Sequence, residues 1–97
     1  MPRASPLFRL REIDEAGNLF DLAIWRVPVT PTYPHGVRYR LAFVRRGDDA
    51  PTVLYDNHAP KGDHRHTAGV EQPYAFVDVD QLVSDFRADA ERAEETR

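Results

Sequence analysis

At 97 residues the chain has room for one hydrophobic core, and we expect a single domain over residues 1–97. It contains no cysteine, which excludes disulfides, thiolate metal ligands and cysteine nucleophiles and leaves imidazole and oxygen ligands for any metal. The net charge of −3 combines +4 over residues 1–46, where every base is an arginine, with −7 over residues 47–97. An arginine-rich half suits contact with phosphates, but oppositely charged elements lying side by side explain the asymmetry equally well.

No apolar run in the sequence is long enough for the core of a signal peptide or for a membrane span. We therefore expect a cytoplasmic protein of bacterial type with no membrane contact. The sequence leaves the oligomeric state open, and a homodimer is one possibility.

The first half of the chain predicts three strands. Apolar and charged residues alternate over residues 7–14, and an apolar run follows over residues 19–27 after a turn, so these segments predict a hairpin whose second strand is buried on both faces near its middle. Prolines at 28, 31 and 34 with Gly36 predict a loop, which contains His35. Residues 37–45 alternate again, with Tyr39 toward the core and Arg38 and Arg40 outward.

The second half predicts a short strand, a polar loop and a helix. Residues 52–56 form the fourth strand, and residues 73–77 form a possible fifth. Asp78 is the expected helix N-cap, with Gln81 three positions later, and apolar residues then recur at helical spacing up to Ala93. The predicted fold is α+β: an antiparallel sheet of four to five strands with one C-terminal helix packed on one face.

Residues 55–66, which we call the histidine segment, hold three of the four histidines among acids and bases. Imidazole titrates near neutral pH, so this composition suits proton transfer or metal binding better than core packing. His64 and His66 are two residues apart and leave the same side of an extended backbone. His58 could join them if the intervening loop folds back, and Asp56 could orient one ring.

Three interpretations of the histidine segment compete. In the first, His64 and His66 cleave RNA by metal-independent acid–base catalysis, with Arg65 or Lys61 stabilising the developing charge on phosphorus. In the second, His64 and His66 bind zinc, nickel or manganese with His58, Asp56 or Asp63, although Lys61 and Arg65 bring positive charge to such a site. In the third, the histidines are structural and the chain is a non-catalytic binding module.

Residues outside the segment add weaker signals. Trp25 and Tyr39 lie among apolar neighbours and are assigned to packing, because aromatic residues in strands are usually buried. Arg38 and Arg40 remain as a possible footprint for RNA.

The quoted motifs resemble a known family. Residues 55–60 (Tyr-Asp-Asn-His-Ala-Pro), 63–66 (Asp-His-Arg-His), 74–76 (Tyr-Ala-Phe) and 81–86 (Gln-Leu-Val-Ser-Asp-Phe) are similar to the TumE family of bacterial toxin–antitoxin proteins. The resemblance implies a toxin that is neutralised by a helix-turn-helix antitoxin. The positions that match the family pattern are Asp56, Asn57, His58, His64 and His66. The resemblance does not reach the arginines. From residue chemistry and the resemblance together, we expect His64, His66, His58, Asp56 and Arg65 to be catalytic and Lys61, Asn57, Arg38 and Arg40 to contact substrate.

Overall fold

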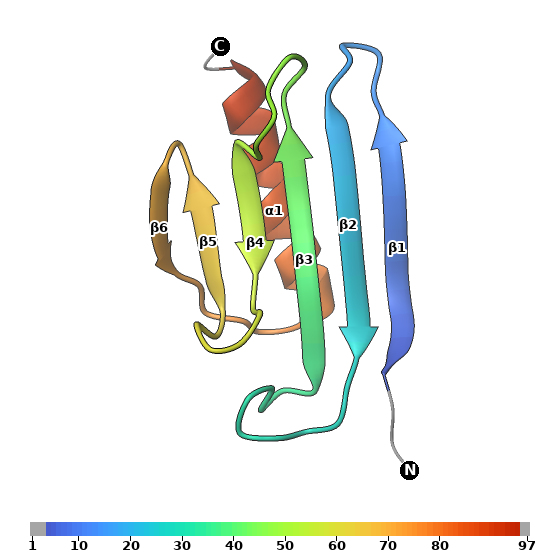
Figure 1. The fold of residues 1–97 in the computed structure, drawn as a ribbon, viewed down its shortest axis with the longest axis vertical. Coiled ribbons are helices and arrows are strands. Elements are labelled where there is room, and N and C mark those ends of the chain that lie inside the picture. Colours follow the sequence, from blue (N-terminus) through green and yellow to red (C-terminus); the bar gives the residue numbers. More distant parts are fainter. Residues whose placement is uncertain (1–3, 96–97) are drawn as a thin grey trace.

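The computed structural model describes residues 4–95, so residues 1–3 and 96–97 of the expected domain lie outside the description. Within that range the chain forms one antiparallel sheet in which each strand pairs with its neighbours in sequence (Figure 1). The strands are β1 (Ser5–Ile13), β2 (Leu19–Arg26), β3 (Val37–Val44), β4 (Val53–Asp56), β5 (His64–Thr67) and β6 (Val70–Pro73), followed by the helix α1 (Val79–Glu95). The α+β class and the C-terminal helix are confirmed, but the sheet has six strands rather than four to five.

The difference in strand number comes from the hairpin of β5 and β6. The histidine segment was expected to be a loop, yet β5 begins inside it at His64. The expected strand over residues 73–77 is absent, since only its first residue belongs to β6. Ala68 and Gly69 both have positive φ, which is the geometry of a two-residue hairpin turn. Neither strand has an apolar alternation, so hydrophobic periodicity gives no sign of the hairpin.

The helix begins where the sequence predicts. The carboxylate of Asp78 accepts a hydrogen bond from the backbone N–H of Gln81 at 2.8 Å, which caps the first turn. The side chain of Gln81 donates to Asp85 instead of returning to the cap. From this start α1 crosses behind the middle of the sheet in Figure 1.

The core lies between α1 and one face of the sheet. Leu82, Phe86 and Ala90 of the helix pack against Leu41 and other strand residues that are almost fully buried. Burying an apolar side chain of this size contributes about 1.5–3 kcal/mol, so this one layer is the main source of stability. The strand residues of the core are Leu22, Ile24, Tyr39, Leu41, Phe43, Val53 and Tyr55.

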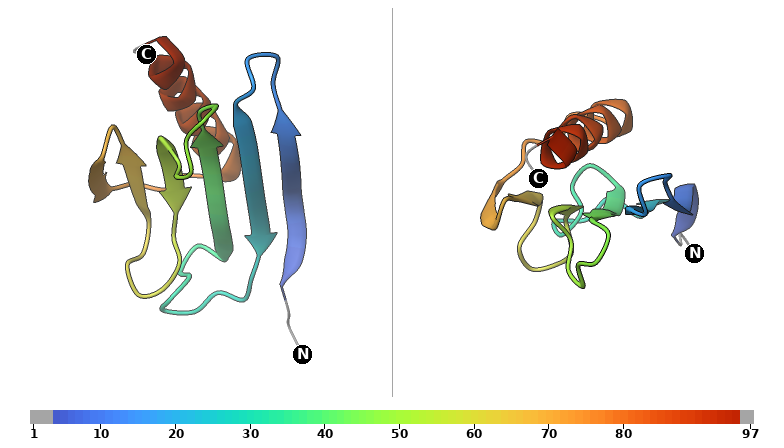
Figure 2. Two further views of the ribbon diagram at one scale, coloured as in Figure 1. Left: turned by 45° about the horizontal axis from the view of Figure 1, so that its top comes forward. Right: turned by 90° about the horizontal axis from the view of Figure 1, so that it is seen from above.

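Among residues 4–95, no helix lies over the opposite face of the sheet, as the view from above in Figure 2 makes clear. Side chains alternate along each strand, so residues that flank the core residues point to this helix-free face, which includes Trp25, Arg40, Asp56, His64 and His66. The expectation that β2 is buried on both faces is therefore wrong, because only Leu22 and Ile24 of this strand are buried. No helix within residues 4–95 is long and apolar enough to cross a membrane.

Candidate functional site

Two histidines lie side by side on the helix-free face because they alternate along β5. His64 and His66 flank Arg65, and the centroids of their rings are 5.5 Å apart. His64 is only 8% exposed, whereas the side chain of His66 is 36% exposed. The predicted pairing of these two imidazoles on one side of the backbone is thus realised, on a strand rather than on a loop.

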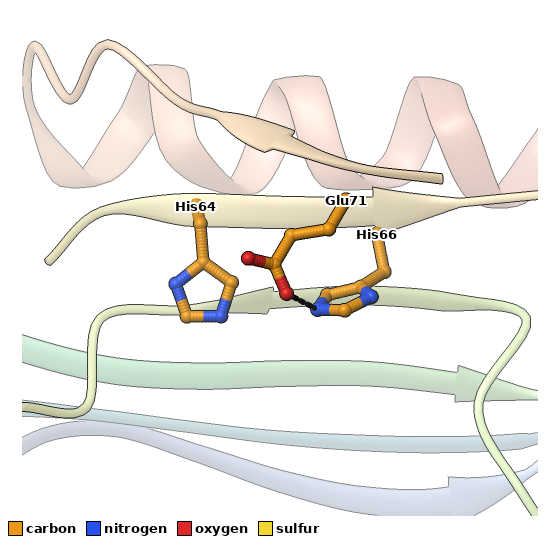
Figure 3. Close-up of side chains that lie close together, drawn as sticks. All are labelled: His64, His66 and Glu71. Carbon is orange, nitrogen blue, oxygen red and sulfur yellow. Dashed lines mark ion pairs between the residues drawn. The ribbon is translucent and has the colours of Figure 1, made fainter. Parts of the chain in front are cut away.

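A carboxylate from the neighbouring strand reaches between the two rings. Glu71 of β6 is directly opposite His66 in the hairpin, and its carboxylate lies 2.9 Å from Nε2 of His66 (Figure 3). Lys61 donates a hydrogen bond to the same carboxylate at 2.7 Å. This hydrogen bond from Lys61 holds the pKa of Glu71 below its usual value, so the carboxylate is charged beside the histidine pair at neutral pH.

The contacts of each ring define which nitrogen carries a proton. Nδ1 of His64 lies 2.8 Å from the carbonyl oxygen of Gly62. A carbonyl only accepts, so Nδ1 is the donor and Nε2 of neutral His64 is a free base. Nε2 of His66 faces a carboxylate and is protonated by the same argument. The two rings are therefore oriented by different acceptors, which favour the Nδ1–H tautomer for His64 and a hydrogen on Nε2 for His66.

A hollow on the helix-free face adjoins this pair. It encloses about 550 Å³ and is lined by Trp25, Arg38, Arg40, Asp56 and His58, among others. Arg40, Asp56 and His64 occupy one cross-strand row, so Asp56 on β4 lies between the hollow and the histidine pair, neither of whose rings lines the hollow. The assignment of Trp25 to core packing is wrong: it is only partly buried, and the Arg38 guanidinium lies 5.9 Å from its ring centroid. Tyr39, by contrast, is buried as expected.

Some residues predicted for the site have other partners. Arg65 points to the helix-covered face, where it donates to the hydroxyl of Tyr55 at 3.0 Å and to Asp89 at 3.2 Å. The hydrogen bond with Tyr55 raises the pKa of Arg65. Asn57 is buried, and its amide bonds the backbone of Tyr39 and Val37 on β3. Both residues stabilise the fold, so we leave them out of the proposed machinery.

The remaining predicted residues divide between the hollow and the loop. Asp56 accepts a hydrogen bond from the backbone N–H of His58 at 2.7 Å, and both residues line the hollow rather than the pair. Within residues 4–95, the ligand-bearing residues that gather around the pair are His64, His66 and Glu71, without His58. Asp63, considered above as a metal ligand, binds His35 and Tyr39 instead.

Glu71 belongs to the site but was not predicted from the sequence. Its signal is the turn at Ala68 and Gly69: a two-residue hairpin loop there places Thr67 opposite Val70 and His66 opposite Glu71. His35 was also left without a role. Its contact with Asp63 joins two loops that are 28 residues apart in sequence, which no local pattern predicts.

Comparison with known proteins gives one match. The sequence model of the family described as Toxin TumE matches residues 4–94. The chain therefore belongs to the TumE toxin family, and the resemblance seen in the sequence is confirmed. A toxin family implies an antitoxin partner. No curated protein and no solved structure matches the chain significantly.

Proposed function

From membership of the TumE toxin family and the geometry of the helix-free face, we propose that this toxin cleaves RNA by metal-independent acid–base catalysis at His64 and His66. The observation that supports this most strongly is the pair itself: two imidazoles, 5.5 Å apart, each fixed through one ring nitrogen by a different acceptor. Positioned acid and base groups of this kind contribute about 10²–10⁴-fold to a rate each.

The contacts of the two rings suggest their roles in this proposal. The free Nε2 of His64 takes the proton of a ribose 2′-hydroxyl, whose oxygen then attacks the adjacent phosphorus. As the new O–P bond forms, the bond from phosphorus to the 5′-oxygen breaks, and protonated His66 supplies a proton to that leaving oxygen. The products are a 2′,3′-cyclic phosphate and a free 5′-hydroxyl. Glu71 orients His66 and compensates its positive charge.

The hollow supplies the binding surface in this proposal. Arg38 and Arg40 are available to phosphates, and the partly buried ring of Trp25 offers an apolar surface on which a base can stack. Lys61, whose side chain is 57% exposed beside Glu71, lies where it can approach the scissile phosphate. His58 and Asp56 line the hollow and belong to the substrate surface rather than to the proton-transfer pair.

RNA cleavage by metal-free protein tests the proposal. In a buffer containing EDTA, wild-type protein should cleave RNA, and His64→Ala and His66→Ala should each lower the rate at least about 100-fold. Both variants should also lose growth inhibition while keeping the wild-type circular dichroism spectrum. His58→Ala is the comparison variant: it removes a histidine of the same segment that lines the hollow, so it should weaken substrate binding and lower the cleavage rate less than either pair variant does. Full cleavage or full toxicity in both pair variants would end the catalytic proposal.

The partner and the compartment follow from the same proposal. A toxin that cleaves cellular RNA acts in the cytoplasm, and its antitoxin has to be made beside it. We propose a helix-turn-helix protein for this role. Co-expression with a small helix-turn-helix protein encoded by the adjacent gene should restore growth and yield a stable complex; continued toxicity would argue against that partner. A homodimer stays a prediction, to be checked by light scattering.

A further inference from the structure

The donor set around the histidine pair is one that binds transition metals. One ligand atom each from His64, His66 and Glu71 lies within 4.8 Å of the others. Two imidazoles and one carboxylate form a known zinc donor set, which leaves a fourth position open for water. In Figure 3 the Glu71 carboxylate lies between the two rings, and the His64 nitrogen farther from the backbone is on the side of His66 and Glu71.

The orientation of His64 matches that of a metal ligand. Metal-binding histidines generally donate their second ring N–H to a carboxylate or a backbone carbonyl, which fixes the tautomer and directs the other nitrogen to the metal. His64 does this through Nδ1 and the carbonyl of Gly62 at 2.8 Å, and the ring is held rigid by being 8% exposed. Nε2 of His64 is thus set before any metal arrives.

The other two ligands are adjustable. Zinc bonds of about 2.0–2.2 Å require the ligand atoms to approach more closely than 4.8 Å. The side chains of His66 and Glu71 are 36% and 40% exposed, so both can rotate to close that gap. Nε2 of His66 already lies 2.9 Å from the carboxylate, and a metal would take the place of the proton held there.

The positive charge near the site is smaller than the sequence suggests. Arg65 lies on the other face of the sheet, bound to Tyr55 and Asp89. Lys61 remains, with its ammonium group 2.7 Å from the Glu71 carboxylate. Because that ammonium group occupies the position that a cation needs, Lys61 competes with a metal for Glu71. The Lys61–Glu71 ion pair is largely exposed, so its competition with a metal is weak enough for a divalent ion to overcome.

We infer that His64, His66 and Glu71 form a reversible zinc site that switches off the histidine pair. Bound zinc occupies the Nε2 atoms of both rings, so Nε2 of His64 can no longer accept a proton and Nε2 of His66 can no longer donate one. Metal binding itself is independent of any RNA-cleaving activity, whereas the inhibitory effect rests on the function proposed above. The protein would then cleave RNA in its metal-free form and be inactive when zinc is bound.

Calorimetric titration of chelator-treated protein with zinc chloride tests the site without RNA. Wild-type protein should bind one zinc ion. Removing a direct ligand in His64→Ala, His66→Ala or Glu71→Gln should weaken binding at least about 100-fold, since even residues that only support metal ligands contribute 10–100-fold. Glu71→Gln changes an exposed side chain, so it stays informative if a histidine variant fails to fold. His58→Ala should bind as wild type does, and Lys61→Met should bind up to about fivefold more tightly.

The outcomes separate the two proposals. If wild-type protein binds no zinc, or if Glu71→Gln and His66→Ala bind it as tightly as wild type, the zinc site is refuted even where RNA is cleaved. If zinc binds in the expected pattern but metal-free protein cleaves no RNA, the function proposed above fails and the site stands. If both hold, zinc should inhibit cleavage by wild-type protein and should leave the residual cleavage by Glu71→Gln unaffected; equal inhibition of the two would overturn the switch.

Discussion

The two faces of the sheet each hold a histidine beside a carboxylate, and their surroundings differ. On the helix-covered side, Asp63 accepts from the hydroxyl of Tyr39 at 2.7 Å and meets Nε2 of His35 at 3.1 Å, while the His35 ring stacks on Phe76 at 4.0 Å. On the helix-free side, Glu71 meets His66 and an exposed lysine. The side chains of the first pair are 22% and 23% exposed and its imidazole stacks on an aromatic ring, whereas those of the second pair are 36% and 40% exposed.

This contrast shows that burial and neighbours decide what a histidine–carboxylate pair does. The oxygens of Asp63 have partners in the strand core and in the proline loop, so the pair joins two loops to the sheet. Nε2 of His64, beside Glu71, is left free by its tautomer and is available for chemistry. Changes on the covered face should therefore act on stability, and changes on the free face should act on function.

The largest effect on stability is expected at Asp89, the buried carboxylate between the helix and the sheet. It accepts hydrogen bonds from Tyr55, Arg65 and Arg92. Asp89→Ala removes the acceptor of the buried Tyr55 hydroxyl and the carboxylate that pairs with Arg65, and it should lower the free energy of unfolding by about 3 kcal/mol, the lower end for breaking a buried ion pair. Urea unfolding measures the change, with the exposed helix residue Glu91→Ala as control. Equal stabilities for the two variants would contradict the structural role of this face.

A smaller loss is expected at Asp63. Asp63→Ala removes the acceptor of Tyr39 and the partner of His35. Leaving a largely buried donor unsatisfied costs about 1–3 kcal/mol, and we expect about 2 kcal/mol here because Asp63 is itself 23% exposed. Thermal and urea unfolding should agree on the loss. A stability equal to wild type would mean that the covered pair is as dispensable as a surface pair.

Which features could be predicted from the sequence depends on how far apart the interacting residues lie in the chain. Apolar periodicity identifies β1 to β4, the cap at Asp78 and the buried side of α1, because all of these depend on neighbours a few residues away. The β5–β6 hairpin depends on a turn and on backbone pairing with β4, and its side chains are mostly polar. Hydrophobic pattern therefore could not reveal it.

Like the fold, the candidate site could be predicted from the sequence only where it depends on residues close together in the chain. The shared orientation of His64 and His66 follows from their spacing alone, whereas the contribution of Glu71 follows only once the hairpin register is known. The positions of Arg65 and Asn57 within the fold depend on partners 24 and up to 20 residues away. The sequence suggested a catalytic role for Arg65 and a substrate contact for Asn57, and tertiary packing gave both a structural task.

Buried tyrosines give the covered face a pH dependence at high pH. Burial, followed by the hydrogen bond to Asp63, raises the pKa of Tyr39, and burial, followed by the hydrogen bond to Asp89, raises the pKa of Tyr55. An unfolded tyrosine ionises near pH 10, so the unfolded state loses protons that the folded state keeps. Stability is complete below about pH 10 and falls as pH rises toward the folded-state values.

The slope of that fall can be measured. Each of the two tyrosines should contribute about 1.4 kcal/mol per pH unit above pH 10. Urea unfolding at several pH values between 9 and 12 gives the slope, and Tyr55→Phe should reduce it by the contribution of one tyrosine, whatever its effect at neutral pH. An unchanged slope in this variant would show that the covered face does not hold Tyr55 neutral.

The smallest effect on stability is expected at Glu71, and it is the sharpest test of the difference between the faces. Both Glu71 and Lys61 are largely exposed, and ion pairs between such residues contribute little to folding. Glu71→Gln should therefore leave the urea midpoint unchanged while lowering RNA cleavage by metal-free protein about tenfold, because His66 loses the carboxylate that orients it. The matched variant Asp63→Asn should show the reverse, with a lower midpoint. If the midpoint of Glu71→Gln falls as far as that of Asp63→Asn, the His66–Glu71 pair is structural too. That result would contradict the assignment of function to the helix-free face.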